Sequence, residues 1–460
     1  MLLAPLPVAY APVLSRRLED LTPLTALLPW VLMVQSPKHP YLRLVVIGQG
    51  YVGLPLAMRA VEVGHQVVGI DLDQNRIQRL NSGNSFIEDI DSSVLQAAIS
   101  GGRYCVSDDF ATSKDFDVAV ITVPTPLKES VPDLGFIESA AASLAPYIGR
   151  GATVVLESTT YPGTTRELLV PILESGSGLV AGEDFHVGYS PERIDPGNQV
   201  WTFVTTPKVV SGLTELCLRK ISDFYGSLVN QIVPVKGCEE AELTKLLENT
   251  FRHVNIALVN ELAVFARELG VDLWAAIDAA STKPFGYMRF TPGPGVGGHC
   301  LPIDPSYLSW RVRQSLGKPF RFVELANDVN EHMPEYVIRR VLLNLNRVKK
   351  TVNGSKIVAL GLAYKRNSGD ARETPAIPII NELARLGAAV TVVDPFVTEL
   401  PTALSDVALR PLSDSLITEA DLVLLLTDHD CFDFVSIASM SQRVFDTRNR
   451  FAEAPNVELL

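Results

Sequence analysis

Short runs of apolar residues alternate with helical patterns along the first half of the chain. The first run, Leu44–Ile47, is followed by a glycine-rich turn, a helical pattern to about Val63, and a second run, Val67–Ile70. Continuous apolar runs of this length are typical of strands buried on both faces of a parallel sheet. The order strand, helix, strand predicts a βαβ unit that ends at Asp71.

Similar runs at 117–122, 152–157, 185–190 and 208–212 are separated by helical segments. We therefore expect an open, mostly parallel sheet in a domain over residues 43–236. A second βαβ unit begins at Ile357–Leu360 and reaches Val390–Val393, with further strands at 421–427 and 443–447. It predicts a C-terminal domain over residues 347–460.

Between these domains the apolar period changes to about 3.6 residues. The apolar positions are Leu243, Leu246, Leu247, Phe251, Val254, Leu258 and Leu262, and the pattern stops at Gly270. It predicts one helix of roughly 30 residues, well above the average length. Such a helix suits a bridge between domains and a dimer interface, so we expect a central helical domain over residues 237–346 and at least a homodimer. The fold class is then α/β, with two Rossmann-like doubly wound domains joined by a helical central domain.

Composition narrows the class of protein. The chain has 460 residues, 47% hydrophobic and 20% charged, with a formal net charge of −12. This balance argues against nucleic-acid and anionic-membrane partners. Its five cysteines are scattered without CxxC pairs, so neither a disulfide framework nor a metal site is supported, and we expect a reducing cytoplasm. For residues 1–42 we expect a loosely ordered leader, with Met33 as the true start as the alternative reading.

The first glycine turn has the spacing of a dinucleotide site. Gly48, Gly50 and Gly53 follow a strand and open a helix, an arrangement that places a pyrophosphate at the helix N-terminus. We expect Gly48, Gly50, Tyr51, Val52 and Gly53 to hold the cofactor. Asp71, 18 residues after Gly53, should bind the ribose and repel a 2′-phosphate, so NAD is predicted over NADP. Arg76 is expected at the edge of this cofactor site, at the start of the neighbouring helix. As a cation, it would suit NADP.

The stretch PGPGVGGHCLPID, residues 292–304, must be a shaped loop because it is poor in helix and strand formers. Its Cys300 is either a buried hydrophobe or a nucleophile near the nicotinamide that takes an aldehyde to an acid. The glycines would then leave room for the substrate, and His299 and Asp304 lie close in sequence.

On the long helix, Lys245 and Asn249 are four residues apart and therefore share a face, which Glu242 and His253 extend. This stripe is either solvated or able to stabilise an alkoxide and its water. In loops that follow strands, Thr125, Ser158 and Thr159 could contact cofactor or substrate, and Glu192, Arg193 and Asp195 lie in a further turn. Capping and turn roles are the alternative there. The loop after Leu360 carries Lys365, Arg366 and Arg372, which could hold a diphosphate or be solvated.

Together the motifs GQGYVGLPLA, VPTP, ESTTYPG, SPERIDPGN, KLLENTFRHVNIALVNELA, PGPGVGGHCLPID and GLAYKRNSGDARETP resemble the nucleotide-sugar 6-dehydrogenase family. The resemblance covers residues 43 to 450. It implies that a sugar C6 alcohol is oxidised twice, with two NAD⁺, to a uronic acid. Single-step hydroxyacid dehydrogenases share the layout, and a catalytically silent nucleotide-binding scaffold is a third hypothesis.

The resemblance also implies roles for individual residues. Cys300 matches the nucleophile that forms a thiohemiacetal and then a thioester. Lys245 and Asn249 match residues near the C6 oxygen and its water. Asp304 matches the aspartate that assists them, and Glu192 the glutamate implicated in hydrolysis.

The remaining matches concern binding. Thr125 and Thr159 match threonines beside the nicotinamide and substrate, with Thr159 also assigned to catalysis. Glu192 and Arg193 are expected at the substrate. Lys365 and Arg372 match contacts to the nucleotide-sugar, which would be UDP- or dTDP-linked.

Departures from the glucose-type pattern favour the N-acetylhexosamine branch. Pro196 stands where that pattern has a second glutamate, and Ile303 where it has a lysine. A UDP- or dTDP-glucose 6-dehydrogenase for polysaccharide or antibiotic-sugar biosynthesis is the alternative.

Overall fold

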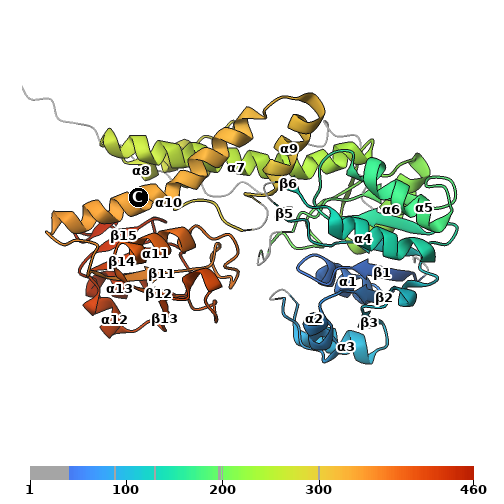
Figure 1. The fold of residues 1–460 in the computed structure, drawn as a ribbon, viewed down its shortest axis with the longest axis horizontal. Helices are drawn as coiled ribbons and strands as arrows, with labels where there is room; N and C mark the ends of the chain where they lie inside the picture. Colours follow the sequence, from blue (N-terminus) through green and yellow to red (C-terminus); the bar gives the residue numbers. More distant parts are fainter. Residues whose placement is uncertain (1–40, 88–89, 129–130, 195–197, 199, 299–300) are drawn as a thin grey trace, which may run out of the picture.

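The computed structural model describes residues 41–460 apart from 88–89, 129–130, 195–197, 199 and 299–300. Two α/β domains lie at the ends of the molecule, and long helices pass over them on one side (Figure 1). In the described part of the chain, no helix has the length and apolar character that crossing a membrane requires.

The N-terminal domain contains a six-stranded sheet with the order β3-β2-β1-β4-β7-β8, parallel throughout. Its strands are β1 (Arg43–Ile47), β2 (Gln66–Ile70), β3 (Tyr104–Ser107), β4 (Val118–Ile121), β7 (Thr153–Leu156) and β8 (His186–Tyr189). Its helices are α1 (Gly53–Glu62), α2 (Gln74–Asn81), α3 (Ser92–Ser100), α4 (Gly135–Leu144), α5 (Val170–Ser177) and α6 (Glu215–Leu228). Every residue of β4, β7 and β8 is buried, which confirms that these apolar runs are covered on both faces.

The predicted buried strand at 208–212 forms, but its expected place in this sheet is wrong. Residues 208–210 form β9 (Lys208–Val210), which pairs only with β10 (Ile232–Pro234) in a separate two-stranded sheet. The following residues, 211–213, donate backbone hydrogen bonds to β8, from Ser211 to Tyr189 and from Leu213 to Val187, both over 3.0 Å. These residues occupy the sheet edge, so β9 is left to pair elsewhere. A small hairpin, β5 (Leu127–Lys128) and β6 (Val131–Pro132), follows β4.

The C-terminal domain repeats the same strand order in a second parallel sheet, β13-β12-β11-β14-β15-β16. Its strands are β11 (Lys356–Leu360), β12 (Ala389–Val393), β13 (Ala408–Leu409), β14 (Leu422–Leu425), β15 (Val444–Asp446) and β16 (Val457–Leu459). Its helices are α11 (Ala376–Arg385), α12 (Asp414–Glu419) and α13 (Phe434–Met440). In both sheets the strand order reverses beside the first strand, between β1 and β4 and between β11 and β14, the place where open α/β sheets bind ligands.

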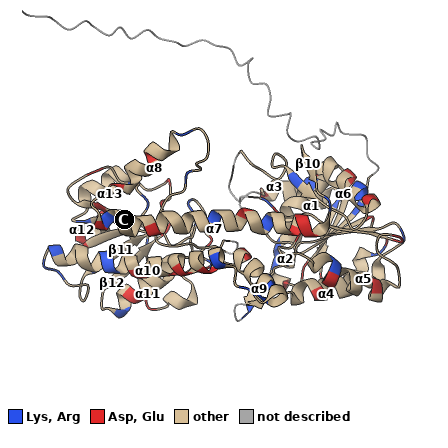
Figure 2. Cartoon of the chain, turned by 90° about the horizontal axis from the view of Figure 1, so that it is seen from above, with Lys and Arg blue, Asp and Glu red and all other residues tan. Residues whose placement is uncertain are grey.

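The central region consists of α7 (Cys238–Glu268), α8 (Leu273–Ser281), α9 (Asp304–Leu316) and α10 (Arg321–Arg347). With 31 residues, α7 confirms the predicted long helix, and it is about 46 Å long at 1.5 Å per residue. Seen from above, it runs from one domain to the other (Figure 2).

The burial of α7 differs from that of an ordinary amphipathic helix, because polar residues are buried beside apolar ones while large apolar residues are exposed. Its polar residues Glu242, Lys245, Asn249 and His253 are buried, whereas Leu247, Phe251, Leu258 and Phe265 are 45–61% exposed. The polar stripe is therefore not a solvated face, and its apolar side is uncovered in this single chain.

Candidate functional site

The glycine turn after β1 has the geometry that a dinucleotide requires. Gly48 has a φ of +94°, and a Cβ there would lie 2.7 Å from the Thr122 carbonyl oxygen. A Cβ on Gly53 would lie 1.8 Å from the Gly48 carbonyl oxygen, so this helix start tolerates only glycine. Gly50, in contrast, has no atom within 4 Å of its Cβ position, which leaves room for a pyrophosphate at the α1 N-terminus. These residues fit NAD.

The carboxylate of Asp71 is hydrogen-bonded to the backbone of this turn. Its Oδ2 accepts hydrogen bonds from the Gln49 backbone N–H (2.7 Å) and from Arg76 Nη1 (2.8 Å). Its Oδ1 accepts from the Asp73 backbone N–H (3.0 Å). Arg76 lies in α2 as expected, but it forms an ion pair with the acid that was predicted to read the ribose.

The reacting groups expected on α7 meet two acids from other parts of the chain. Lys245 Nζ donates to the Glu192 carbonyl oxygen (2.7 Å) and lies 3.2 Å from Glu192 Oε2. Asn249 Nδ2 donates to Asp304 Oδ2 over 2.5 Å. Glu192 follows β8 and Asp304 opens α9, so three separate elements bring these four side chains together.

Burial is the main influence on Asp304, whose residue is 3% exposed. It raises the pKa of this carboxyl from 3.8 to about 6, although Lys245 and the Asn249 hydrogen bond act in the opposite direction. Asp304 is therefore ionised at neutral pH but close enough to its pKa to exchange a proton.

A cavity of about 720 Å³ opens beside this cluster, between α7, the glycine-rich loop and the C-terminal domain. Its described lining includes a single acid, Glu248, which pairs with Arg193 over 2.6 Å. The cations that line it are Arg193, Lys245, Arg252, Arg289, Lys365 and Arg448. A cavity of this size and charge suits a nucleoside diphosphate that carries a sugar.

Three of these cations were not predicted as substrate contacts. Arg252 is seven residues after Lys245, and helical spacing could have placed it on the same side. Arg289 also pairs with Asp278 over 2.5 Å. Arg448 follows β15 at the carboxyl edge of the second sheet, and its Nε donates to the Leu426 carbonyl oxygen over 2.8 Å. The position of Arg448 directly after a strand is the sequence feature that could have identified it as a substrate contact.

The glycines of the loop at 292–298 have a packing role that the sequence did not reveal. A Cβ on Gly295, Gly297 or Gly298 would lie 2.6–2.9 Å from atoms of Pro375, Glu373 or Tyr364. The loop is therefore pressed against the loop that follows β11. Cys300 and His299 lie outside the described residues, as do Asp195 and Pro196.

Three further predicted residues are not among those that line this cavity. Thr125 is buried after β4, and its carbonyl oxygen accepts from the Tyr307 hydroxyl over 2.9 Å. Thr159 is half-buried after β7. Arg372 is held by Asp370, with 2.6 Å between Nη2 and Oδ2, and its guanidinium lies over the ring of Tyr51.

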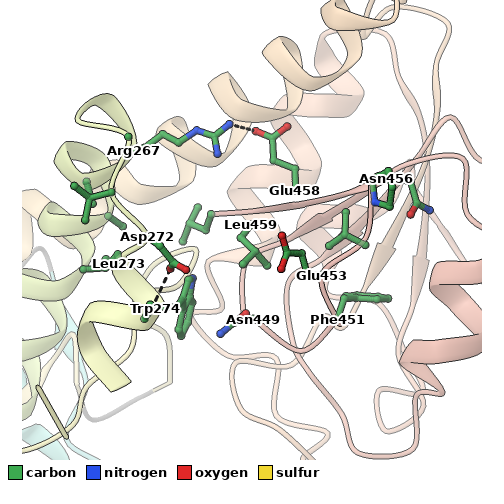
Figure 3. Close-up of a pocket in the computed structure, with 18 of the residues that line it drawn as sticks. Arg267, Asp272, Leu273, Trp274, Asn449, Phe451, Glu453, Asn456, Glu458 and Leu459 are labelled. Atoms are coloured by element: carbon green, nitrogen blue, oxygen red, sulfur yellow. Dashed lines mark hydrogen bonds and ion pairs between the residues drawn. The ribbon is translucent and has the colours of Figure 1, made fainter. Parts of the chain in front are cut away.

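Another cavity, of about 800 Å³, lies far from this cluster, where α7 and α8 meet the C-terminal strand (Figure 3). On its rim, Glu458 of β16 accepts from Arg267 (2.9 Å) and Arg347 (2.6 Å). Its lining mixes arginines with the acids Asp272 and Glu453. We interpret Glu458 as a structural tie between the last strand and the long helices.

Comparisons with known proteins agree with this arrangement. Residues 42–229, 239–332 and 358–453 match the NAD binding, central and UDP binding domains of the UDP-glucose/GDP-mannose dehydrogenase family. The chain is 35% identical over 421 residues to UDP-N-acetyl-D-mannosamine dehydrogenase of Pyrococcus horikoshii, covering 90% of this chain and 97% of that one. It is 34% identical over 411 residues to the Escherichia coli K12 protein of that name, covering 86% and 96%.

Solved structures give the same result. The structure of the Pyrococcus horikoshii UDP-D-ManNAc dehydrogenase matches with a TM-score of 0.81 at 33% identity, covering 91% of this chain and 98% of that one. A UDP-glucose dehydrogenase from Pyrobaculum islandicum matches with a TM-score of 0.79 at 28% identity, covering 93% and 98%. The chain is therefore an NAD-dependent nucleotide-sugar dehydrogenase that belongs to the UDP-glucose/GDP-mannose dehydrogenase family.

Proposed function

We propose that this enzyme oxidises the C6 alcohol of a UDP-linked N-acetylhexosamine to a carboxylate, with UDP-N-acetylmannosamine as the first candidate. The observation that carries the proposal is the cluster of buried Lys245, Asn249 and Asp304 with half-buried Glu192, beside a cavity with six cations. The cations suit the diphosphate, and the buried cluster suits the reacting end of the sugar. The names of the relatives and the residues Pro196 and Ile303 favour the N-acetylated sugar.

The first oxidation needs a group that removes the alcohol proton. Asp304 is ionised at neutral pH and accepts this proton through a water, while Lys245 and Asn249 stabilise the developing alkoxide. NAD⁺, which Gly48, Gly50 and Gly53 would hold at the glycine turn, would supply the hydride acceptor for each of the two oxidations. The product of the first oxidation is an aldehyde.

In the second oxidation Cys300 supplies the nucleophile. Its thiolate adds to the aldehyde carbon and the oxygen takes a proton, which gives a thiohemiacetal. Loss of a second hydride and of the hydroxyl proton gives a thioester. Water, positioned by Glu192 and Asp304, then adds to the carbonyl, and the sulfur leaves as thiolate. The sugar has lost four electrons in total.

The apolar side of α7 supports a homodimer. Seven large apolar residues of this helix and its C-terminal cap are 41–77% exposed, namely Leu243, Leu247, Phe251, Leu258, Leu262, Phe265 and Leu269. An apolar strip of this length is rarely left in water. Light scattering should give about 100 kDa, twice the 50.1 kDa of the chain, and Leu258→Glu should reduce this mass. A wild-type mass near 50 kDa would refute the dimer.

We also place the enzyme in the cytoplasm, because the proposed thiolate requires reducing conditions. Fractionation of cells should recover the enzyme with cytoplasmic markers, and recovery from an extracellular fraction would contradict the assignment.

A substrate panel tests the sugar. UDP-linked ManNAc, GlcNAc and glucose, together with dTDP-glucose, are offered with NAD⁺, and NADH release gives kcat/KM. We expect an N-acetylated sugar to exceed UDP-glucose at least tenfold. A preference for UDP-glucose or dTDP-glucose would favour the alternative, which the Pyrobaculum islandicum match also supports.

A further inference from the structure

A chain of buried side-chain hydrogen bonds connects the two long helices to the glycine-rich loop. The Gly293 backbone N–H donates to Asn260 Oδ1, and Asn260 Nδ2 donates to Asn330 Oδ1, both over 2.9 Å. Asn330 Nδ2 then lies 3.4 Å from His253 Nδ1, and His253 Nε2 lies 2.7 Å from Asn327 Oδ1. Asn260, His253 and Asn330 are 0%, 2% and 5% exposed, so water does not compete for these bonds.

The backbone N–H of Gly293 can only donate. It therefore fixes which group donates in each of the other hydrogen bonds of this series. Asn260 must therefore turn its oxygen to Gly293 and its NH₂ group to Asn330. Asn330 in turn accepts with its oxygen and presents its NH₂ group to His253. This NH₂ group lies 3.4 Å from the ring atom Nδ1 and 3.5 Å from the His253 carbonyl oxygen. Both contacts favour an unprotonated Nδ1, with the proton of neutral His253 on Nε2, facing Asn327.

The charge environment is compatible with a neutral ring. Burial lowers the pKa of His253, and the Asn327 hydrogen bond only partly opposes this. Glu331 of α10 and Glu373 of the loop after β11 line the same cavity of about 390 Å³ as His253. Both acids are exposed to solvent, which weakens their pull on a proton at the ring.

The loop at 292–298 forms one wall of the cavity of about 720 Å³. Gly293, Gly295 and Gly297 line it together with Lys245 and Asn249. Asn260 follows Asn249 by eleven residues on α7, which is about three turns and returns to nearly the same face. Helix α7 thus carries Lys245 and Asn249, two of the proposed reacting groups, and also Asn260, which holds the loop at 292–298.

We propose that Asn260 is a positioning residue, which holds the loop at 292–298 against the nucleotide-sugar cavity through Gly293, with its amide oriented by Asn330 and the unprotonated Nδ1 of His253. The proposal rests on the proposed function, since the cavity must bind the sugar nucleotide for the loop to matter.

Two variants distinguish a positioning role of Asn260 from a role in packing alone. Asn260→Leu keeps the branching of the side chain but can neither accept from Gly293 nor donate to Asn330. We expect kcat to fall about tenfold or more and KM for the nucleotide-sugar to rise, because small displacements near a reacting centre can cost about a hundredfold in rate. KM for NAD⁺ should stay within about twofold. Asn260→Asp still accepts from Gly293, so it should recover most of the lost rate.

The Asn260→Asp variant also gives a spectroscopic signature. The carboxylate that it introduces cannot donate, so Asn330 must rotate its amide and present its oxygen to His253 Nδ1, which then needs a proton. In ¹⁵N spectra of histidine-labelled protein at about pH 7.5, His253 should change from the Nε2–H form to one protonated at Nδ1. His253→Leu assigns the signal, and Asn346→Leu, at an exposed asparagine of α10, should alter neither kinetics nor spectrum.

The outcomes are distinct. Wild-type enzyme that turns over no nucleotide-sugar refutes the proposed function. If the wild type is active, the positioning role is overturned when Asn260→Leu keeps wild-type kcat and KM. It is also overturned when Asn260→Asp loses as much rate as Asn260→Leu without any change at His253. If Asn260→Leu does not fold, as judged by thermal unfolding, the rate and spectrum of Asn260→Asp decide.

Discussion

The guanidinium of Arg372 lies 5.5 Å from the centre of the Tyr51 ring. Tyr51 belongs to the cofactor turn, whereas Arg372 belongs to the domain that matches the UDP binding family domain. The neighbouring Gly298 N–H donates to the Arg372 carbonyl oxygen over 3.3 Å. One arginine therefore contacts the cofactor turn with its side chain and the glycine-rich loop with its backbone.

This contact predicts a link between the two binding sites. Tyr51→Ala removes the ring, and we expect KM for NAD⁺ and for the nucleotide-sugar each to rise about two- to fivefold, the effect of losing a cation–π contact of about 0.5–1 kcal/mol. Tyr51→Phe keeps the ring and should stay near wild type. Unchanged KM values in Tyr51→Ala would show that the contact has no role in binding.

Asp71 should decide between NAD and NADP. We expect Asp71→Ala to shift the ratio of kcat/KM values towards NADP⁺ by about tenfold or more, because it removes the acid and frees Arg76 for a 2′-phosphate. Arg76→Ala keeps Asp71 and should keep the preference for NAD⁺. Initial rates with both cofactors give the ratio, and an unaltered ratio in Asp71→Ala would mean that another residue reads the ribose.

Asp304 should produce an acid limb in the pH profile. Its pKa is raised to about 6, so the carboxylate that the proposed reaction requires is lost as the pH falls through this value. Below about pH 6 we expect kcat to fall about tenfold per pH unit in the wild type. Asp304→Asn should be slower throughout and lack this limb.

The control for Asp304 is Asp328→Asn, at an exposed acid of α10, which should keep the wild-type profile. An acid limb that persists in Asp304→Asn would assign it to another group. The same raised pKa means that the folded protein holds this proton more tightly than the unfolded chain. The stability that this contributes is present at pH below about 4 and is lost as the pH rises through about 6.

Lys245→Met should lower kcat by about 10²–10³, the usual cost of removing a donor that stabilises a developing oxyanion. It also leaves Glu192 without its cation. Lys356→Met, which breaks only the exposed pair with Glu419, is the matched control and should leave kcat unchanged. A Lys245→Met rate within about threefold of wild type would remove this residue from the reaction.

Sequence patterns were sufficient for most of the strands and for the long helix. Apolar runs at Leu44–Ile47 and Ile357–Leu360 predicted the central strand of each sheet, because strands covered on both faces need no polar positions. The spacing of the three glycines identified the cofactor turn, where Gly48 and Gly53 have no room for a side chain and Gly50 leaves room for the pyrophosphate.

What the sequence did not reveal depends on contacts between distant segments. The 208–210 run looks like any other strand, and only the occupied edge of β8 excludes it from the main sheet. Glu242 was read as part of a solvated or reactive stripe, but it is buried and accepts from the Gly163 and Thr165 backbone N–H groups over 2.6 and 2.8 Å. Burial raises its pKa to about 7. Arg448, 203 residues after Lys245, joins the cavity only through the fold.

The most direct test of the four-electron oxidation is the number of NADH molecules formed per sugar. A limiting, measured amount of UDP-N-acetylmannosamine, or of the best substrate in the panel, is oxidised to completion with excess NAD⁺, and the absorbance of NADH is compared with the sugar consumed. We expect two NADH and one uronic acid for each sugar. One NADH with an aldehyde as the final product would contradict the four-electron oxidation.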